Sequence, residues 1–180
     1  KRGLAGLRAI RYQVSIQIGE TVLTAIAIPN DPCELTRFIE AHYHARHRKD
    51  LPRLASLAAK VEQVHASSPD VPAGLADLLK RMIGELEVHM KKEELLLFPA
   101  IRKGGVPGLH APIAVMRGDH DDHSADIARI RELTNNLAPP ADACQSWRTL
   151  YEELGNFIGE LDAHIKLEID VLFPRFDATH

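Results

Sequence analysis

An eleven-residue segment that pairs a histidine with a glutamate occurs twice in the chain. It reads HMKKEELLLFP from residue 89 and HIKLEIDVLFP from residue 164. In each copy the glutamate follows the histidine by four residues, which places the two side chains on one face of an α-helix. The pairs are His89 with Glu93 and His164 with Glu168. Their recurrence in register with Leu-Phe-Pro indicates an internal duplication.

Two interpretations of this segment compete. A single His-x3-Glu pair is more often a solvated patch beside an apolar stripe than a ligand pair. A solvent-facing charge, however, has no reason to recur in register with apolar residues that a core would bury. Inward-facing carboxylates are costly unless they are paired or bind a metal. We therefore predict that both copies face a metal site.

Two further helices can each add a histidine to that site. In the second half this is His120. The two copies of the segment are 75 residues apart, and the position 75 residues before His120 is residue 45, directly after His44. Spacing alone leaves His47, three residues later, as an equal candidate. Four imidazoles and two carboxylates suit two ions of iron, manganese or zinc rather than calcium or copper(I). For iron, bridging by both carboxylates and by an added oxo or hydroxo group is expected.

Other polar residues receive weaker expectations. Glu85 and Glu160 precede the repeated histidines by four residues, which favours a role beside the centre or along an ion path. His123 is an occasional ligand or a partner of one, with a surface position favoured. Cys144 is expected to be small and buried rather than reactive. Four histidines are expected to be solvated or distant from the centre: His42, His65, His110 and His180.

Start and stop signals divide the chain into four long helices. The sequence Asp31-Pro32-Cys33-Glu34 starts the first, which ends near residue 67. The second runs from residues 70–72 to 103, the third from about 112 to 134 and the fourth from about 142 to 176. Short connections predict an all-α, antiparallel up-down four-helix bundle made of two duplicated αα-hairpins over residues 31–180. Residues 1–30 form an appended segment of ambiguous pattern.

The composition argues against a nucleic-acid-binding protein, a disulfide-rich protein and a membrane protein. The chain has 180 residues and a net charge of −3, without a basic patch for nucleic acid. The two cysteines lack the spacing of a zinc site or a disulfide framework, so a reducing cytoplasm fits. The sequence contains neither the roughly 18 apolar residues of a membrane helix nor a recognisable signal peptide.

Taken together, the motifs resemble the hemerythrin-like proteins, and among them the di-iron proteins that repair iron-sulfur clusters. The resemblance covers residues 31–176. In that family the ligands are four histidines and two bridging glutamates, which implies His44 rather than His47. Oxygen-carrying hemerythrins use a fifth histidine four residues after the one on the third helix, where this chain has Ser124. The motifs are Tyr43-His44-x2-His47-Arg48, Val64-His65-Ala66, His89-Met90-x2-Glu93-Glu94-x3-Phe98-Pro99, His120-Asp121, Thr134-Asn135-Asn136, Ala143-Cys144-x2-Trp147 and His164-x3-Glu168-x3-Leu172-Phe173-Pro174-Arg175.

The resemblance also implies a function. Members of the family are cytoplasmic stress proteins, and the resemblance implies that this chain donates iron from a His4Glu2 centre to iron-sulfur proteins damaged by nitric oxide or peroxide. The implied ligand set is His44, His89, Glu93, His120, His164 and Glu168. Alternatives are an oxygen or nitric-oxide binding module and a di-iron nitric-oxide or peroxide reductase. A homodimer is a further expectation, although residues 1–30 lack the cysteine pair that the family's N-terminal domain usually carries.

Overall fold

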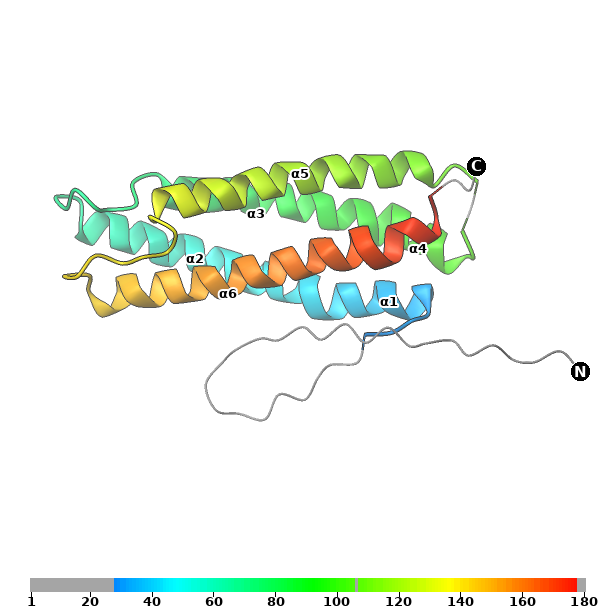
Figure 1. Ribbon diagram of the computed structural model, residues 1–180, viewed down its shortest axis with the longest axis horizontal. Coiled ribbons are helices and arrows are strands. Elements are labelled where there is room, and N and C mark those ends of the chain that lie inside the picture. The colour runs from blue at the N-terminus through cyan, green and yellow to red at the C-terminus, as the bar shows by residue number, and fades with distance from the viewer. Residues whose placement is uncertain (1–27, 106, 178–180) are drawn as a thin grey trace, which may run out of the picture.

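Four helical rods make up the part of the chain that the computed structural model describes, residues 28–105 and 107–177. Figure 1 shows them side by side, with successive rods running in opposite directions. No strand occurs within these ranges. The predicted all-α four-helix bundle is therefore confirmed. The predicted N-terminal segment lies almost wholly outside the described residues, so the boundary at residue 31 stays a prediction.

Three of the rods are interrupted by a wider helical turn. The first consists of α1 (Pro32–Ile39), η1 (Glu40–His44) and α2 (Ala45–Val64). The second consists of α3 (Leu75–Lys92), η2 (Glu93–Leu97) and α4 (Phe98–Arg102). The third is α5 (His110–Leu133), and the fourth consists of α6 (Gln145–Leu167), η3 (Glu168–Leu172) and η4 (Phe173–Arg175). Segments η1, η2 and η3 are π-helical, a form that often marks functional sites.

The helix starts agree with the predictions to different degrees. Asp31 caps α1 as predicted, since its carboxylate accepts a hydrogen bond of 3.0 Å from the Glu34 backbone. The predicted starts near residues 70 and 142 are three to five residues too early. Helix α3 begins after Gly74, whose φ is +89°, and the backbone N–H of Ala76 is capped by Glu62 from the preceding rod at 2.8 Å. This cap is a tertiary contact, so the local sequence does not reveal it.

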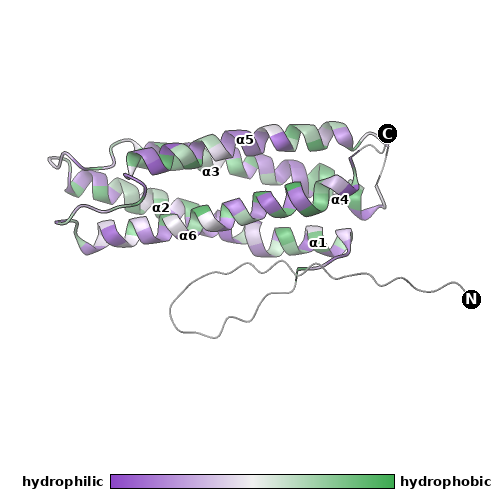
Figure 2. Ribbon diagram, in the orientation of Figure 1, coloured by the Kyte–Doolittle hydropathy of each residue, from purple (hydrophilic) through white to green (hydrophobic). Residues whose placement is uncertain are grey.

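Apolar side chains fill the bundle in two separate clusters. The larger contains Leu51, Leu86, Trp147 and Leu161, and the smaller contains Ile39, Leu97, Phe98, Met116 and Phe173. Figure 2 shows hydrophobic and hydrophilic residues alternating around each rod, as expected for helices with one buried face. Along the chain, the predicted ligands lie between members of the two clusters, so a polar layer divides the core. In residues 28–105 and 107–177, no helix is long and apolar enough to cross a membrane.

Candidate metal centre

The bundle brings the six predicted ligands together in one buried cluster. They form two groups, His44, Glu93, His164 and Glu168, and His89, Glu93, His120 and Glu168. Within each group the candidate ligand atoms lie within 4.8 Å of one another. All six side chains are at most 2% exposed. Both groups share the two glutamates, which is the arrangement expected for carboxylates between two ions.

All four histidines direct Nε2 toward a glutamate. The Nε2 atoms of His44 and His89 lie 3.2 and 3.5 Å from Oε2 of Glu93. Those of His120 and His164 lie 3.1 and 3.2 Å from the carboxylate of Glu168. Within the described ranges, hydrogen-bond partners are lacking for five of these buried atoms: His44 Nε2, both oxygens of Glu93, His120 Nε2 and Glu168 Oε2. Buried polar atoms are normally paired, so this set of donors fits a bound cation.

Burial makes the histidines good ligands for a cation. It lowers the pKa of His44 to about 4 and that of His89 to about 3. Both rings are therefore neutral near pH 7 and keep a lone pair for a metal. Metal binding by imidazole requires this neutral form.

The two carboxylates respond in opposite directions. Burial and the neighbouring Glu168 raise the pKa of Glu93 well above its usual value. Burial alone would also raise the pKa of Glu168, but His164 and His120 hold it well below its usual value. Two buried carboxylates side by side cannot both ionise without a counter-charge. A cation between them would supply that charge.

The π-helical turns coincide with three of the candidate ligands. His44 ends η1, while Glu93 begins η2 and Glu168 begins η3. The turns at Glu93 and Glu168 are copies of each other within the duplicated segment. Phe98 and Phe173, which follow these turns, stack on the rings of His44 and His120 at centroid distances of 5.9 and 5.8 Å. The repeated Phe-Pro thus covers one ring in each half of the centre.

Acidic side chains hold the far nitrogen of two candidate ligands. Glu94 lies 2.8 Å from Nδ1 of His44 and is itself paired with Arg48 at 2.8 Å. Asp119 lies 3.2 Å from Nδ1 of His89 and 2.8 Å from Nζ of Lys92. Such partners fix the orientation of a ligand ring and increase its basicity. Sequence reasoning missed both acids, although each lies one residue from a predicted ligand.

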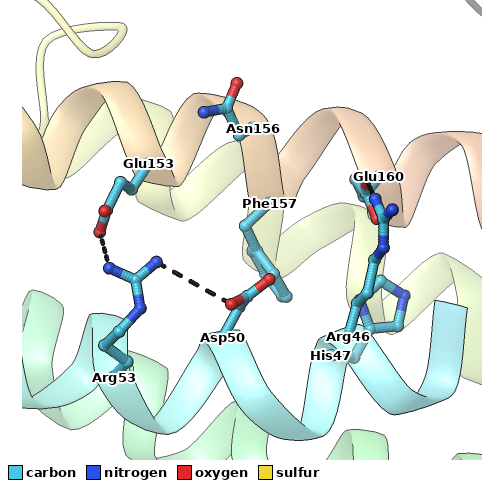
Figure 3. Close-up of a pocket in the computed structure, with 8 residues that line it drawn as sticks. All are labelled: Arg46, His47, Asp50, Arg53, Glu153, Asn156, Phe157 and Glu160. Carbon is cyan, nitrogen blue, oxygen red and sulfur yellow. Dashed lines mark hydrogen bonds and ion pairs between the residues drawn. The ribbon is translucent and has the colours of Figure 1, made fainter. Parts of the chain in front are cut away.

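Glu85 and Glu160 each line a cavity beside the cluster. The cavity between α2 and α6 measures about 190 Å³ and is lined by Glu160, its ion-pair partner Arg46, and His47 (Figure 3). The cavity between α3 and α5 measures about 560 Å³ and is lined by Glu85 and His123. The two cavities are related by the duplication. The expectation that these glutamates lie near the centre agrees with this placement, and their role stays a prediction.

The other polar residues differ from several expectations. His123 is only 3% exposed, so the favoured surface position is wrong. Cys144 is exposed rather than buried as expected; it occupies the N-cap position of α6, where its side chain makes no capping hydrogen bond. His110 is exposed, as expected. His42 and His65 are half-buried, the latter 3.1 Å from the sulfur of Cys144, and His180 lies outside the described residues.

Comparison with known proteins agrees with this geometry. The family model described as "Hemerythrin HHE cation binding domain" matches residues 39–176. The iron-sulfur cluster repair protein YtfE of Pectobacterium atrosepticum is 45% identical over 142 residues, covering 79% of this chain and 64% of the relative. A probable iron-sulfur cluster repair protein of Haemophilus influenzae is 44% identical with the same coverage. The YtfE protein of Escherichia coli O157:H7 is 40% identical over 175 residues, covering 93% and 80%. The chain thus spans just under two thirds of the first two relatives.

Proposed function

The chain belongs to the hemerythrin family of HHE cation binding domains, and on that basis we propose that it is a non-haem di-iron protein that repairs damaged iron-sulfur clusters. The repair is by donation of iron after nitrosative or oxidative stress, in the cytoplasm. One observation carries the proposal: two groups of buried donors share both glutamates, and several of their atoms lack a partner among the described residues. The names of the relatives support the same function.

The six side chains divide into two pairs of histidines and one pair of bridging acids. His44 and His164 would hold one iron ion, His89 and His120 would hold the other, and Glu93 and Glu168 belong to both groups of donors. Imidazole and carboxylate are donors that iron accepts readily. When bound, iron would supply a redox-active Lewis acid. With two neutral ligands for each ion, further ligands could also bind.

Iron donation requires a centre that releases its metal as well as binding it. The donor set favours release over permanent retention, because each ion depends on only two histidines and on carboxylates that it shares. Glu85 and Glu160 lie in cavities on opposite sides of the centre. These acids provide paths by which a divalent cation enters or leaves. Iron-sulfur proteins with damaged clusters are the acceptors.

Metal analysis and timed iron transfer test the proposal. Purified protein is expected to contain two irons per chain, to lose them in His89→Ala and Glu168→Ala, and to keep them in His110→Ala, which changes an exposed histidine. The iron-loaded protein is then mixed with a purified iron-sulfur protein whose cluster nitric oxide has degraded. Recovery of that cluster without added iron is expected from the wild type and not from the two ligand variants.

Other outcomes would contradict specific parts of the proposal. Iron that binds oxygen or nitric oxide reversibly, and is not transferred, would favour a binding module. Steady turnover of nitric oxide or peroxide with a reductant would favour an enzyme. Protein that takes up no metal would remove the di-iron centre itself.

A further inference from the structure

The outer nitrogens of the four candidate ligand rings are held in different ways. Glu94 and Asp119 lie beside Nδ1 of His44 and His89. Nδ1 of His164 instead lies 3.3 Å from Nε2 of another histidine, His47. Nδ1 of His120 has no hydrogen-bond partner within residues 28–105 and 107–177. The described residues give His164 Nδ1 one hydrogen-bond partner, and that partner is an imidazole.

The internal repeat explains why a histidine takes this place. Asp119 precedes His120 directly, and the corresponding residue in the first half, directly before His44, is Tyr43. The Tyr43 ring stacks flat on His164, with centroids 5.2 Å apart and an interplanar angle of 6°. This contact is through the ring faces and supplies no acceptor for Nδ1. Hence the acid that holds His89 has no counterpart beside His164.

His47 is placed and oriented to substitute for that acid. It is 2% exposed, and Phe157 packs against its ring with centroids 5.6 Å apart at 76°. Figure 3 shows His47 and Phe157 among the residues that line the cavity between α2 and α6. A ligand histidine that binds metal through Nε2 carries its proton on Nδ1, and a buried N–H without an acceptor is costly. A neutral His47 offers the lone pair of Nε2 to that proton.

We propose that His47 is a positioning residue for the metal centre, which accepts the Nδ1 proton of His164 and thereby holds that ring with Nε2 directed at the metal. The role rests on the proposed metal centre and adds to it a third outer residue, after Glu94 and Asp119, that does not itself touch the ion. Removing such an outer partner typically weakens metal binding about 10- to 100-fold. His47 therefore determines how tightly the ion between His44 and His164 is held.

Three variants separate this role from simple packing. His47→Leu removes the acceptor, whereas His47→Gln keeps a side chain of similar size with an amide oxygen that can accept from Nδ1. His65→Leu is the control, because His65 is half-buried at the end of the same helical rod and its ring contacts Cys144 and Trp147, away from the candidate ligands. Melting temperatures of the metal-free proteins establish that each variant folds.

Zinc binding is measured by competition with a chelator. Two zinc ions per chain are expected for the wild type. His47→Leu is expected to weaken one of the two sites by about 10- to 100-fold. His47→Gln is expected to bind within a few-fold of the wild type, and His65→Leu is expected to bind like the wild type. Unaltered binding in His47→Leu, equal weakening in His65→Leu, or no rescue by glutamine would each overturn the positioning role. A wild type that binds neither zinc nor iron would overturn the metal centre together with it.

A spectroscopic measurement follows the proton itself. In nitrogen-15-labelled, zinc-loaded protein, long-range proton–nitrogen spectra assign the tautomer of His164 and the exchange of its Nδ1 proton with water. A slowly exchanging Nδ1 proton is expected in the wild type and in His47→Gln, and rapid exchange is expected in His47→Leu. Rapid exchange already in the wild type would overturn the proposal without any variant.

Discussion

Replacing Glu93 with glutamine is expected to stabilise the metal-free protein while removing tight metal binding. The Glu93 side chain is fully buried, and neither of its oxygens has a hydrogen-bond partner in the described part of the chain. Keeping the Glu93 carboxyl protonated, while it ionises in the unfolded chain, costs about 1–3 kcal/mol between about pH 5 and pH 6.5. Glutamine keeps the shape and cannot ionise, so it does not carry this cost. For a protein of this size, 1 kcal/mol shifts the melting temperature by about 2–4 °C, so we expect an increase of about 2–12 °C.

The dependence of this gain on pH follows from the pKa of Glu93. Burial and Glu168 raise that pKa above its value in the unfolded chain, which is about 4.3. The folded protein therefore retains a proton that the unfolded chain releases, and the contribution of Glu93 to the stability of the wild type becomes less favourable as pH rises above that value. Glutamine does not titrate. The advantage of Glu93→Gln is thus expected to be larger at pH 8 than at pH 5.

Thermal unfolding of chelator-treated proteins measures both effects. The control is Glu94→Gln, which changes the neighbouring residue. Glu94 is partly exposed and lies 2.8 Å from both Arg48 and Nδ1 of His44. Glutamine keeps an oxygen that can accept from that ring, so the replacement mainly weakens the ion pair with Arg48 and is expected to lower stability by about 1 kcal/mol or less. A lower melting temperature for Glu93→Gln at pH 8, or a larger advantage at pH 5, would refute the reasoning that this carboxylate is kept at the expense of stability.

Three further predictions concern the same centre. Because burial lowers the pKa of His44 to about 4 and of His89 to about 3, the metal-free Glu93→Gln protein, which lacks the opposing titration of Glu93, should lose stability as pH falls below the unfolded value of about 6.5; a urea midpoint of that variant that is the same at pH 7.5 and pH 5 would contradict this. Asp119→Asn should weaken iron binding about 10- to 100-fold, and chelator competition that matches the wild type would count against it. Glu85→Gln and Glu160→Gln should leave iron content unchanged but slow its release to a chelator, and wild-type rates in both variants would exclude the ion-path role.

Sequence patterns predicted that the two His-x3-Glu pairs face the same region of the bundle, because this spacing places both side chains on one face of a helix. Each glutamate follows its histidine by four residues, and the repeat marks Glu93 and Glu168 as equivalent. The structure brings both copies into one polar layer. The helix start at Asp31 was predictable for a similar reason, since cap and helix are neighbours in sequence.

The features that sequence reasoning missed depend on contacts between distant segments or on small changes in helical geometry. Helix α3 is capped by Glu62 from another rod. The burial of His123 depends on how α5 packs against α3, which periodicity within one helix does not determine. The π-helical turns that begin at Glu93 and Glu168 widen the helix locally, and no particular residue type marks them in the sequence.

The duplication itself limits what the sequence can predict about the outer part of the centre. Equivalent inner ligands imply two equivalent metal positions, but the residues behind them have diverged between the halves. Glu94, which holds His44, corresponds to Ile169 in the second copy of the segment, and Nδ1 of His120 accordingly lacks a partner within the described residues. The surroundings of the two proposed metal positions therefore differ chemically, although the repeat makes their ligands look alike. The proposed role in holding and donating iron would gain from such inequality, because one ion could leave while the other kept the bundle's polar layer neutralised.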